Sequence, residues 1–125
     1  SLEALDLSET SLAVIPPEIG NLTKLEGLFL GHNLLEELPP EIGRLTALKT
    51  LSLNKNRLAV LPPEIGNLTE LTELWLNDNK LTALPVELCA LVKLNELQIY
   101  DNELDYPDDV IGGGVSKIFH HVKKQ

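Results

Sequence analysis

The chain has 125 residues, of which 43% are hydrophobic but only 4% aromatic, so one domain with a mainly aliphatic core is expected. Its formal net charge of −9 argues against nucleic acid or an anionic membrane as the main ligand, because both require a basic protein surface. The charge favours a partner with basic groups, or it serves solubility alone. The single cysteine, Cys89, excludes an internal disulfide, and no apolar run approaches the roughly 20 residues of a membrane span.

Leucine recurs along the chain with a period of 23 residues, as at positions 2, 25, 48, 71 and 94. Such a period is typical of a solenoid, in which stacked units share one continuous core that no single unit could form. The period defines four full units and one partial unit. These are 2–24, 25–47, 48–70, 71–93 and the partial 94–110.

The first half of each unit predicts a short strand. Leu5, Asp6 and Leu7 alternate apolar and polar, which is the pattern of a half-buried strand. Equivalent segments in the other units predict a parallel sheet of about five strands, with leucines facing the core. An asparagine follows at the turn, where its amide can bond backbone groups that no strand satisfies. The equivalent asparagines are Asn33, Asn56 and Asn79.

The second half of each unit predicts a short 3-10 or irregular segment on the opposite, convex side. The sequence Pro-Pro-Glu-Ile-Gly stands at 16–20, 39–43 and 62–66, with a drifted Pro-Val-Glu-Leu-Cys at 85–89. Proline cannot donate a hydrogen bond to a sheet, so these segments lie outside it. In the second unit, Ile42 and Leu45 are expected to face the core.

The two ends of the chain differ. The pattern begins in mid-unit at Leu2, which predicts that further sequence precedes it. At the other end the repeat loses its register after Leu104, and apolar residues then recur with helical spacing. We therefore expect a repeat array over 1–110 and a capping helix over 111–125 that covers the last repeat. The apolar stripe of this helix is Val115, Ile118, Phe119 and Val122.

The pattern LxxLxLxxNxLxxLPxEIGxL resembles the leucine-rich repeats of the intracellular Ras-group type, which also occur in some bacteria, and the match covers residues 2–104. The resemblance implies an α/β repeat solenoid, a right-handed superhelix whose parallel strands line its concave side. It further implies a monomeric cytoplasmic scaffold for protein binding and signalling, because members of this family mostly act as protein-interaction scaffolds.

Outward-facing strand positions would form the binding face of such a solenoid. Three of the five aromatic residues fall there: Phe29, Trp75 and Tyr100. Large aromatic side chains are common anchors of protein interfaces, although scattered surface aromatics are also normal and favour strands. Phe29 and Trp75 would lie about two strand spacings, roughly 10 Å, apart. The predicted partner-binding residues are Asp6, Phe29, His32, Ser52, Asn54, Lys55, Glu73, Trp75, Asn77, Asp78, Glu96, Gln98 and Tyr100.

The same face is expected to be acidic, since only Lys55 and His32 oppose its carboxylates. Such a surface would steer a basic or mixed-charge partner, or would simply be a solvated acidic face. The six acidic residues are Asp6, Glu9, Glu73, Asp78, Glu96 and Asp101.

Residue patterns that would support catalysis are not recognisable. There is no phosphate loop and no nucleophilic triad, and Cys89 has no histidine near it in the pattern. The acidic stretch 101–109 fits a loop better than a calcium site, because Tyr106 stands where an EF-hand needs glycine. We therefore expect no enzyme activity, cofactor or metal. A non-catalytic binding module is the leading hypothesis; the alternatives are the recognition arm of a kinase, phosphatase, GTPase or ubiquitin ligase, and a structural or engineered array without a partner.

Overall fold

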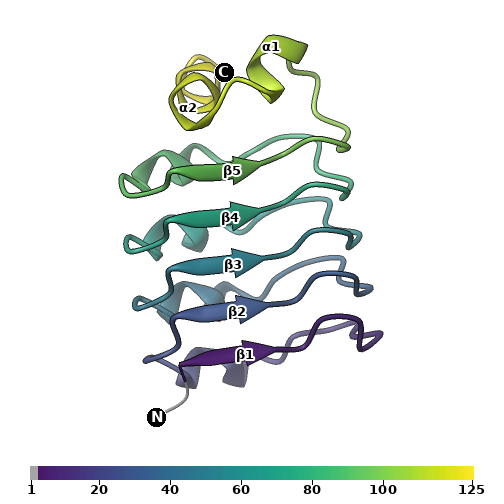
Figure 1. Cartoon of the computed structure of the whole chain (residues 1–125), viewed down its shortest axis with the longest axis vertical. Coiled ribbons are helices and arrows are strands. Elements are labelled where there is room, and N and C mark those ends of the chain that lie inside the picture. Colours follow the sequence, from purple (N-terminus) through teal and green to yellow (C-terminus); the bar gives the residue numbers. More distant parts are fainter. Residues whose placement is uncertain (1–2) are drawn as a thin grey trace.

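The computed structural model describes residues 3–125, so Leu2, where the first repeat unit begins, lies outside the described residues. Five short strands form one parallel sheet, in which each strand lies beside the next one in the sequence (Figure 1). The predicted parallel sheet of about five strands is thereby confirmed. The strands are β1 (Ala4–Asp6), β2 (Gly27–Phe29), β3 (Thr50–Ser52), β4 (Glu73–Trp75) and β5 (Glu96–Gln98).

The register of the sheet equals the period of the sequence. Leu28 pairs with Leu51, and Leu51 pairs with Leu74, each 23 residues further along the chain. Every repeated position therefore becomes a row that runs across the strands. These three leucines are fully buried, and each such side chain contributes about 1.5–3 kcal/mol through burial.

Four 3-10 helices form a second layer, which lies behind the strands in Figure 1. A proline at the first or second position begins three of them, because its fixed φ suits this conformation and its missing N–H would have no partner there. Ile42 and Leu45 are fully buried beneath this layer, as predicted. The helices are η1 (Pro17–Asn21), η2 (Pro40–Arg44), η3 (Pro63–Asn67) and η4 (Val86–Ala90).

Buried asparagines join each turn to the turn of the preceding unit. The Oδ1 atom of Asn56 accepts a hydrogen bond from the Leu35 amide at 3.0 Å. Its Nδ2 atom donates to the carbonyls of Leu30 at 2.9 Å and Leu53 at 3.1 Å. The predicted bonding of turn backbone by the asparagine amides is thereby confirmed. Equivalent bonds to the preceding unit are made by Asn33, Asn79 and Asn102.

The residue before each of these asparagines has a left-handed backbone with φ between 55° and 60°, and so does Glu9 at the equivalent position before Thr10. This conformation costs a residue other than glycine roughly 1–2 kcal/mol, and the bonds of the asparagine next to it help to hold it. The strand pattern predicts these residues among the outward-facing strand positions. That placement is wrong, because the left-handed backbone puts them in the turn that ends the strand. They are Glu9, His32, Lys55, Asp78 and Asp101.

Neighbouring 3-10 helices approach so closely that they require glycine. A Cβ atom at Gly66 would lie 2.5 Å from the Glu87 carbonyl oxygen, and one at Gly43 would lie 2.8 Å from that of Glu64. Cys89 occupies the same position in the fourth unit, where the next neighbour is a cap helix. Its Sγ atom lies 3.8 Å from the Phe119 carbonyl oxygen. A cysteine can therefore replace glycine in the fourth unit, because the neighbouring element is a cap helix and not another 3-10 helix.

The C-terminal cap has two helices, α1 (Asp108–Ile111) and α2 (Val115–Lys123), where one helix over 111–125 was expected (Figure 1). Glycines 112–114 separate them, and Gly114 has a φ of +87° immediately before α2. The side chains of Ile118 and Val122 are buried, and α2 packs against η4. The helix α1 was missed because four residues are too few to show a helical period.

We predict that Asn56→Ala lowers the free energy of unfolding by roughly 2 kcal/mol, because it leaves the buried Leu35 amide without a partner and removes one of the two amide donors from each of the Leu30 and Leu53 carbonyls. Urea denaturation followed by circular dichroism measures the change. The matched control is Asn21→Ala, since Asn21 is exposed at the end of η1. Equal effects of the two substitutions would contradict a structural role for the asparagine row.

We further predict that Gly66→Ala destabilises the fold by about 1–3 kcal/mol, because the added methyl group must push the η3 and η4 backbones apart. Gly112→Ala is the control, since a Cβ there would meet its nearest atom at 3.8 Å. Thermal unfolding of both variants measures the difference. A Gly66→Ala protein as stable as the Gly112→Ala protein would show that the 3-10 layer can expand freely.

Candidate functional site

One face of the sheet is turned away from the 3-10 layer, and we call it the open sheet face (Figure 1). Its central row consists of residues that pair in register from strand to strand. A second row lies two residues before it and a third lies two residues after it, since alternate residues of a strand share a face. The central row is Asp6, Phe29, Ser52, Trp75 and Gln98.

Two large aromatic side chains stand in the central row. Phe29 pairs with Ser52, and Ser52 pairs with Trp75, so the two aromatics lie on either side of one small residue. Both are half-buried. The ring of Phe29 leans over Gly27, where a Cβ atom would lie 3.0 Å from the ring. Tyr100 lies in the third row, beyond the end of β5, and is 44% exposed.

The support of Phe29 by Gly27 was missed in the sequence analysis. Glycine in a strand often marks a place where another group approaches closely, and this signal was present in the sequence. Gly31 has a similar role in the next row, because a Cβ atom there would lie 2.9 Å from Oδ1 of Asn54.

Polar side chains between and around the aromatics are held by hydrogen bonds. The Ser52 hydroxyl donates to Oδ1 of Asn54 at 2.7 Å, and both residues are half-buried. Asn77 was predicted as a contact residue, but it is only 4% exposed. Its Nδ2 atom donates to Oδ2 of Asp78 at 2.7 Å. The structure therefore places Asn77 beneath the surface that a partner would meet first.

The acidic residues of β4 and β5 are also oriented by neighbours. The Thr50 hydroxyl donates to a carboxylate oxygen of Glu73 at 3.1 Å, and the Gln98 amide donates to Glu96. Among residues 3–125, the ion pairs are Lys49–Glu26, Lys93–Glu70 and Lys117–Asp109. None of them involves an acidic residue of the open sheet face. Lys55 and the exposed His32, expected to oppose the acidic residues, lie in the left-handed turns.

Asp6 lies on the first strand and is exposed. Its Oδ1 atom accepts a hydrogen bond from the Ser8 amide at 2.9 Å. The Ser8 backbone amide, followed by the Ser8 hydroxyl, holds the pKa of the Asp6 carboxyl below its usual value. Asp6 thus satisfies a backbone amide just beyond the end of β1 and places a charge at the outer side of the sheet.

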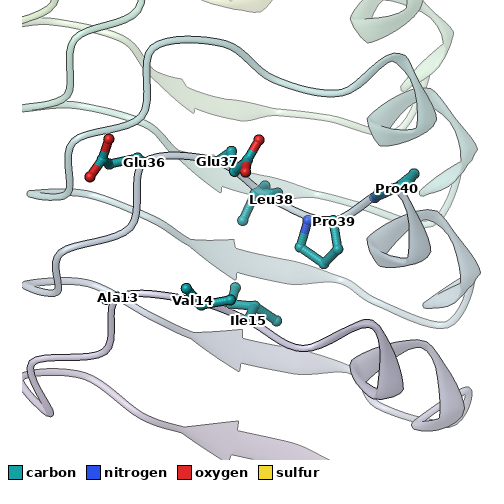
Figure 2. Close-up of a pocket in the computed structure, with 8 residues that line it drawn as sticks. All are labelled: Ala13, Val14, Ile15, Glu36, Glu37, Leu38, Pro39 and Pro40. Atoms are coloured by element: carbon teal, nitrogen blue, oxygen red, sulfur yellow. The ribbon is translucent and has the colours of Figure 1, made fainter.

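A hollow of about 390 Å³ lies away from the strands, between residues 13–15 and residues 36–40 (Figure 2). Figure 2 shows these two segments side by side in neighbouring units, leading toward the 3-10 helices. Val14, which is 70% exposed, is one of its lining residues. The ionisable side chains in its lining are those of Glu36 and Glu37.

Within the described part of the chain, no group of three or more His, Cys, Asp or Glu side chains converges as a metal site. At the end of the acidic stretch 101–109, Asp109 of α1 forms an ion pair with Lys117 of α2 at 3.1 Å. Hydrogen bonding from Lys117 holds the pKa of the Asp109 carboxyl below its usual value. None of the helices over residues 3–125 has the length and hydrophobicity needed to span a bilayer.

Comparisons with known proteins identify relatives of the fold. The sequence matches the family described as a leucine-rich repeat region over residues 1–110. A leucine-rich-repeat protein of Leptospira interrogans is similar over 82% of this chain, with 45% identity and a TM-score of 0.80. The BIR2 ectodomain of Arabidopsis thaliana is similar over 82% of this chain, with 30% identity and a TM-score of 0.73. The matches span 26% and 56% of those two chains. A comparison with curated proteins gives no significant match.

Cys89 is the single thiol of the chain and is half-buried. Desolvation raises the pKa of this thiol, and the nearby charge of Lys123 opposes the shift only in part. We predict that Ellman's reagent at pH 8 reacts with the folded protein about tenfold more slowly than with the urea-unfolded chain, because the thiolate is the reactive form. Cys89→Ser controls for background colour. Equal rates in the two states would identify Cys89 as an accessible nucleophile.

Proposed function

The chain belongs to the leucine-rich-repeat family, and we propose that it acts as a non-catalytic module whose open sheet face binds a partner protein. Proteins of this family commonly mediate protein–protein interaction. The observation that supports the proposal best is the placement of Phe29 and Trp75 in one row of a face that the 3-10 layer does not cover. The expected cytoplasmic location, signalling role and monomeric state remain predictions.

The geometry of this row suits a protein ligand. Phe29 and Trp75 flank Ser52, so a small residue lies between two bulky ones about two strand spacings, or roughly 10 Å, apart. A side chain of a partner can enter above Ser52 and contact both rings. Aromatic side chains lose little conformational entropy on binding, since each has only two rotatable bonds, which is one reason why they anchor interfaces.

The supporting contacts hold this surface in place before any partner arrives. Gly27 allows the Phe29 ring to lie close to the sheet, and Ser52 is bonded to Asn54. Preorganised side chains bind more tightly because less freedom is lost on association. The same face would bind the substrate if the chain were the recognition arm of a larger enzyme. The binding experiment below therefore applies to both the binding-module hypothesis and the enzyme-arm hypothesis.

We predict that the double variant Phe29→Ala, Trp75→Ala loses partner capture, because each aromatic anchor contributes about 2 kcal/mol to binding. Capture of a partner from a cell extract on the immobilised chain, followed by mass spectrometry, measures the loss. Circular dichroism checks that the variant is folded.

The matched control is Val14→Ala, Val60→Ala, which removes two exposed apolar side chains outside the open sheet face. Its capture is expected to equal that of the unchanged protein. A partner that both double variants retain, or that both lose, would contradict binding on the open sheet face.

A further inference from the structure

We propose that the part of the open sheet face formed by β4 and β5 binds an arginine side chain of the partner protein. This inference rests on the proposed function and specifies the chemistry of the ligand. It is carried by in-register carboxylates around Trp75 and by a buried oxygen of Asn77 that has no hydrogen-bond donor.

Acidic residues face each other across β4 and β5. Glu73 pairs directly with Glu96 in the row before Trp75. The pairing continues past the strand ends, since the Asp78 amide donates to the Tyr100 carbonyl at 3.0 Å, and this brings Asp78 next to Asp101. Like charges directly opposite each other on neighbouring strands destabilise a sheet. A cation bound between them would remove this repulsion.

The cations of the chain leave this area unneutralised. Over residues 3–125, Glu73 and Glu96 take part in no ion pair. Lys49 is the closest cation in sequence to the start of β3, and its ammonium group pairs with Glu26 at 3.5 Å. Lys55 holds the position equivalent to Asp78 in the neighbouring unit, but the two side chains form no ion pair. The site therefore has negative charge available for an external ligand.

Asn77 supplies the second observation. Its side chain is 4% exposed, and its Oδ1 atom is buried without a hydrogen-bond partner among residues 3–125. Asn77 faces the same side as Trp75, because the intervening Leu76 is in the core. A buried acceptor without a donor is costly, and most such atoms in proteins are paired. Rotation of the amide toward the open sheet face would bring this oxygen within reach of an N–H donor of the partner.

Trp75 lies between these groups. Glu73 and Asn77 are two residues away on either side, about 6.6 Å along the strand, and Gln98 is its neighbour on β5. A guanidinium group is planar, stacks on aromatic rings and carries five N–H donors. It can lie on the indole while donating to the carboxylates of Glu73 and Glu96, which pair with each other in the row before Trp75. The compact ammonium of lysine fits this arrangement of flat ring and separated acceptors less well.

The acceptors are already oriented. Glu73 is bonded by the Thr50 hydroxyl at 3.1 Å, and Glu96 is bonded by the Gln98 amide. These bonds use only part of the capacity of each carboxylate, which can accept several donors. The arrangement therefore resembles a charged recognition site more than a freely solvated acidic patch.

Trp75 also provides the probe for the test, because it is the single tryptophan of the chain. A short acetylated peptide containing two arginines separated by glycine is titrated while Trp75 fluorescence is recorded at low salt. The same peptide with citrulline in place of arginine keeps the shape and removes the charge. We expect the citrulline peptide to bind about tenfold more weakly, since the stacked cation and its carboxylate bonds are lost.

Two double variants change the net charge equally at different places. The first is Glu73→Gln, Glu96→Gln on the open sheet face. The second is Glu41→Gln, Glu64→Gln in η2 and η3 of the opposite layer. Glutamine can still accept the bonds from Thr50 and Gln98, so the fold should persist. We expect the first variant to weaken arginine-peptide binding about tenfold and the second to change it less than twofold.

The outcomes separate this inference from the proposed function. Equal binding of the arginine and citrulline peptides, or equal weakening by the two variants, would overturn the arginine site. The protein-binding role is judged separately, by capture on the Phe29→Ala, Trp75→Ala variant. Loss of capture in that variant would uphold the binding face even if the arginine peptide fails. Selective weakening by the first variant supports the arginine site whether or not a partner is captured.

Discussion

The hydrogen bonding of the buried asparagines is the constraint on which the rest of the structure depends. Each unit leaves its strand after only three residues of regular pairing, and the backbone then turns through a left-handed residue. Buried backbone groups at such a turn need partners. Asn56 supplies them to its own unit and to the preceding one at the same time. Because every turn is tied to its neighbour in this way, the strands keep one register, and the open sheet face becomes a set of ordered rows.

Ordered rows allow the two sides of each strand to serve different purposes. The row of Leu28, Leu51 and Leu74 is the same from unit to unit and fully buried, so it supports a constant spacing between these strands. The central row of the open sheet face changes from Phe29 to Ser52 to Trp75 without altering that spacing. Variation in the outward rows therefore alters the ligand that the face can accept, while the core and the asparagines keep the backbone in place.

The repeat period predicted the strands, the 3-10 layer and the asparagine bonds, because each of these depends on residues within one unit or its neighbour. The helical spacing of apolar residues after Leu104 predicted the α2 stripe. Three features could not be predicted in this way. The left-handed turns displaced His32, Lys55 and Asp78 from the expected row, since alternation along a strand does not report φ. The burial of Asn77 depends on side-chain packing across strands. The helix α1 is too short to have a detectable period.

The glycine of the 3-10 layer has a consequence for how such an array can grow. A unit with glycine at this position, such as the one containing Gly66, lets another unit stack against it, since a Cβ atom would meet the next backbone at 2.5 Å. The unit containing Cys89 has a side chain there and is followed by α2 instead. The residue at this one position therefore determines whether another unit can stack against the 3-10 helix. Duplication of an inner unit can lengthen the molecule without any other change, whereas duplication of the fourth unit would require the cysteine to revert to glycine.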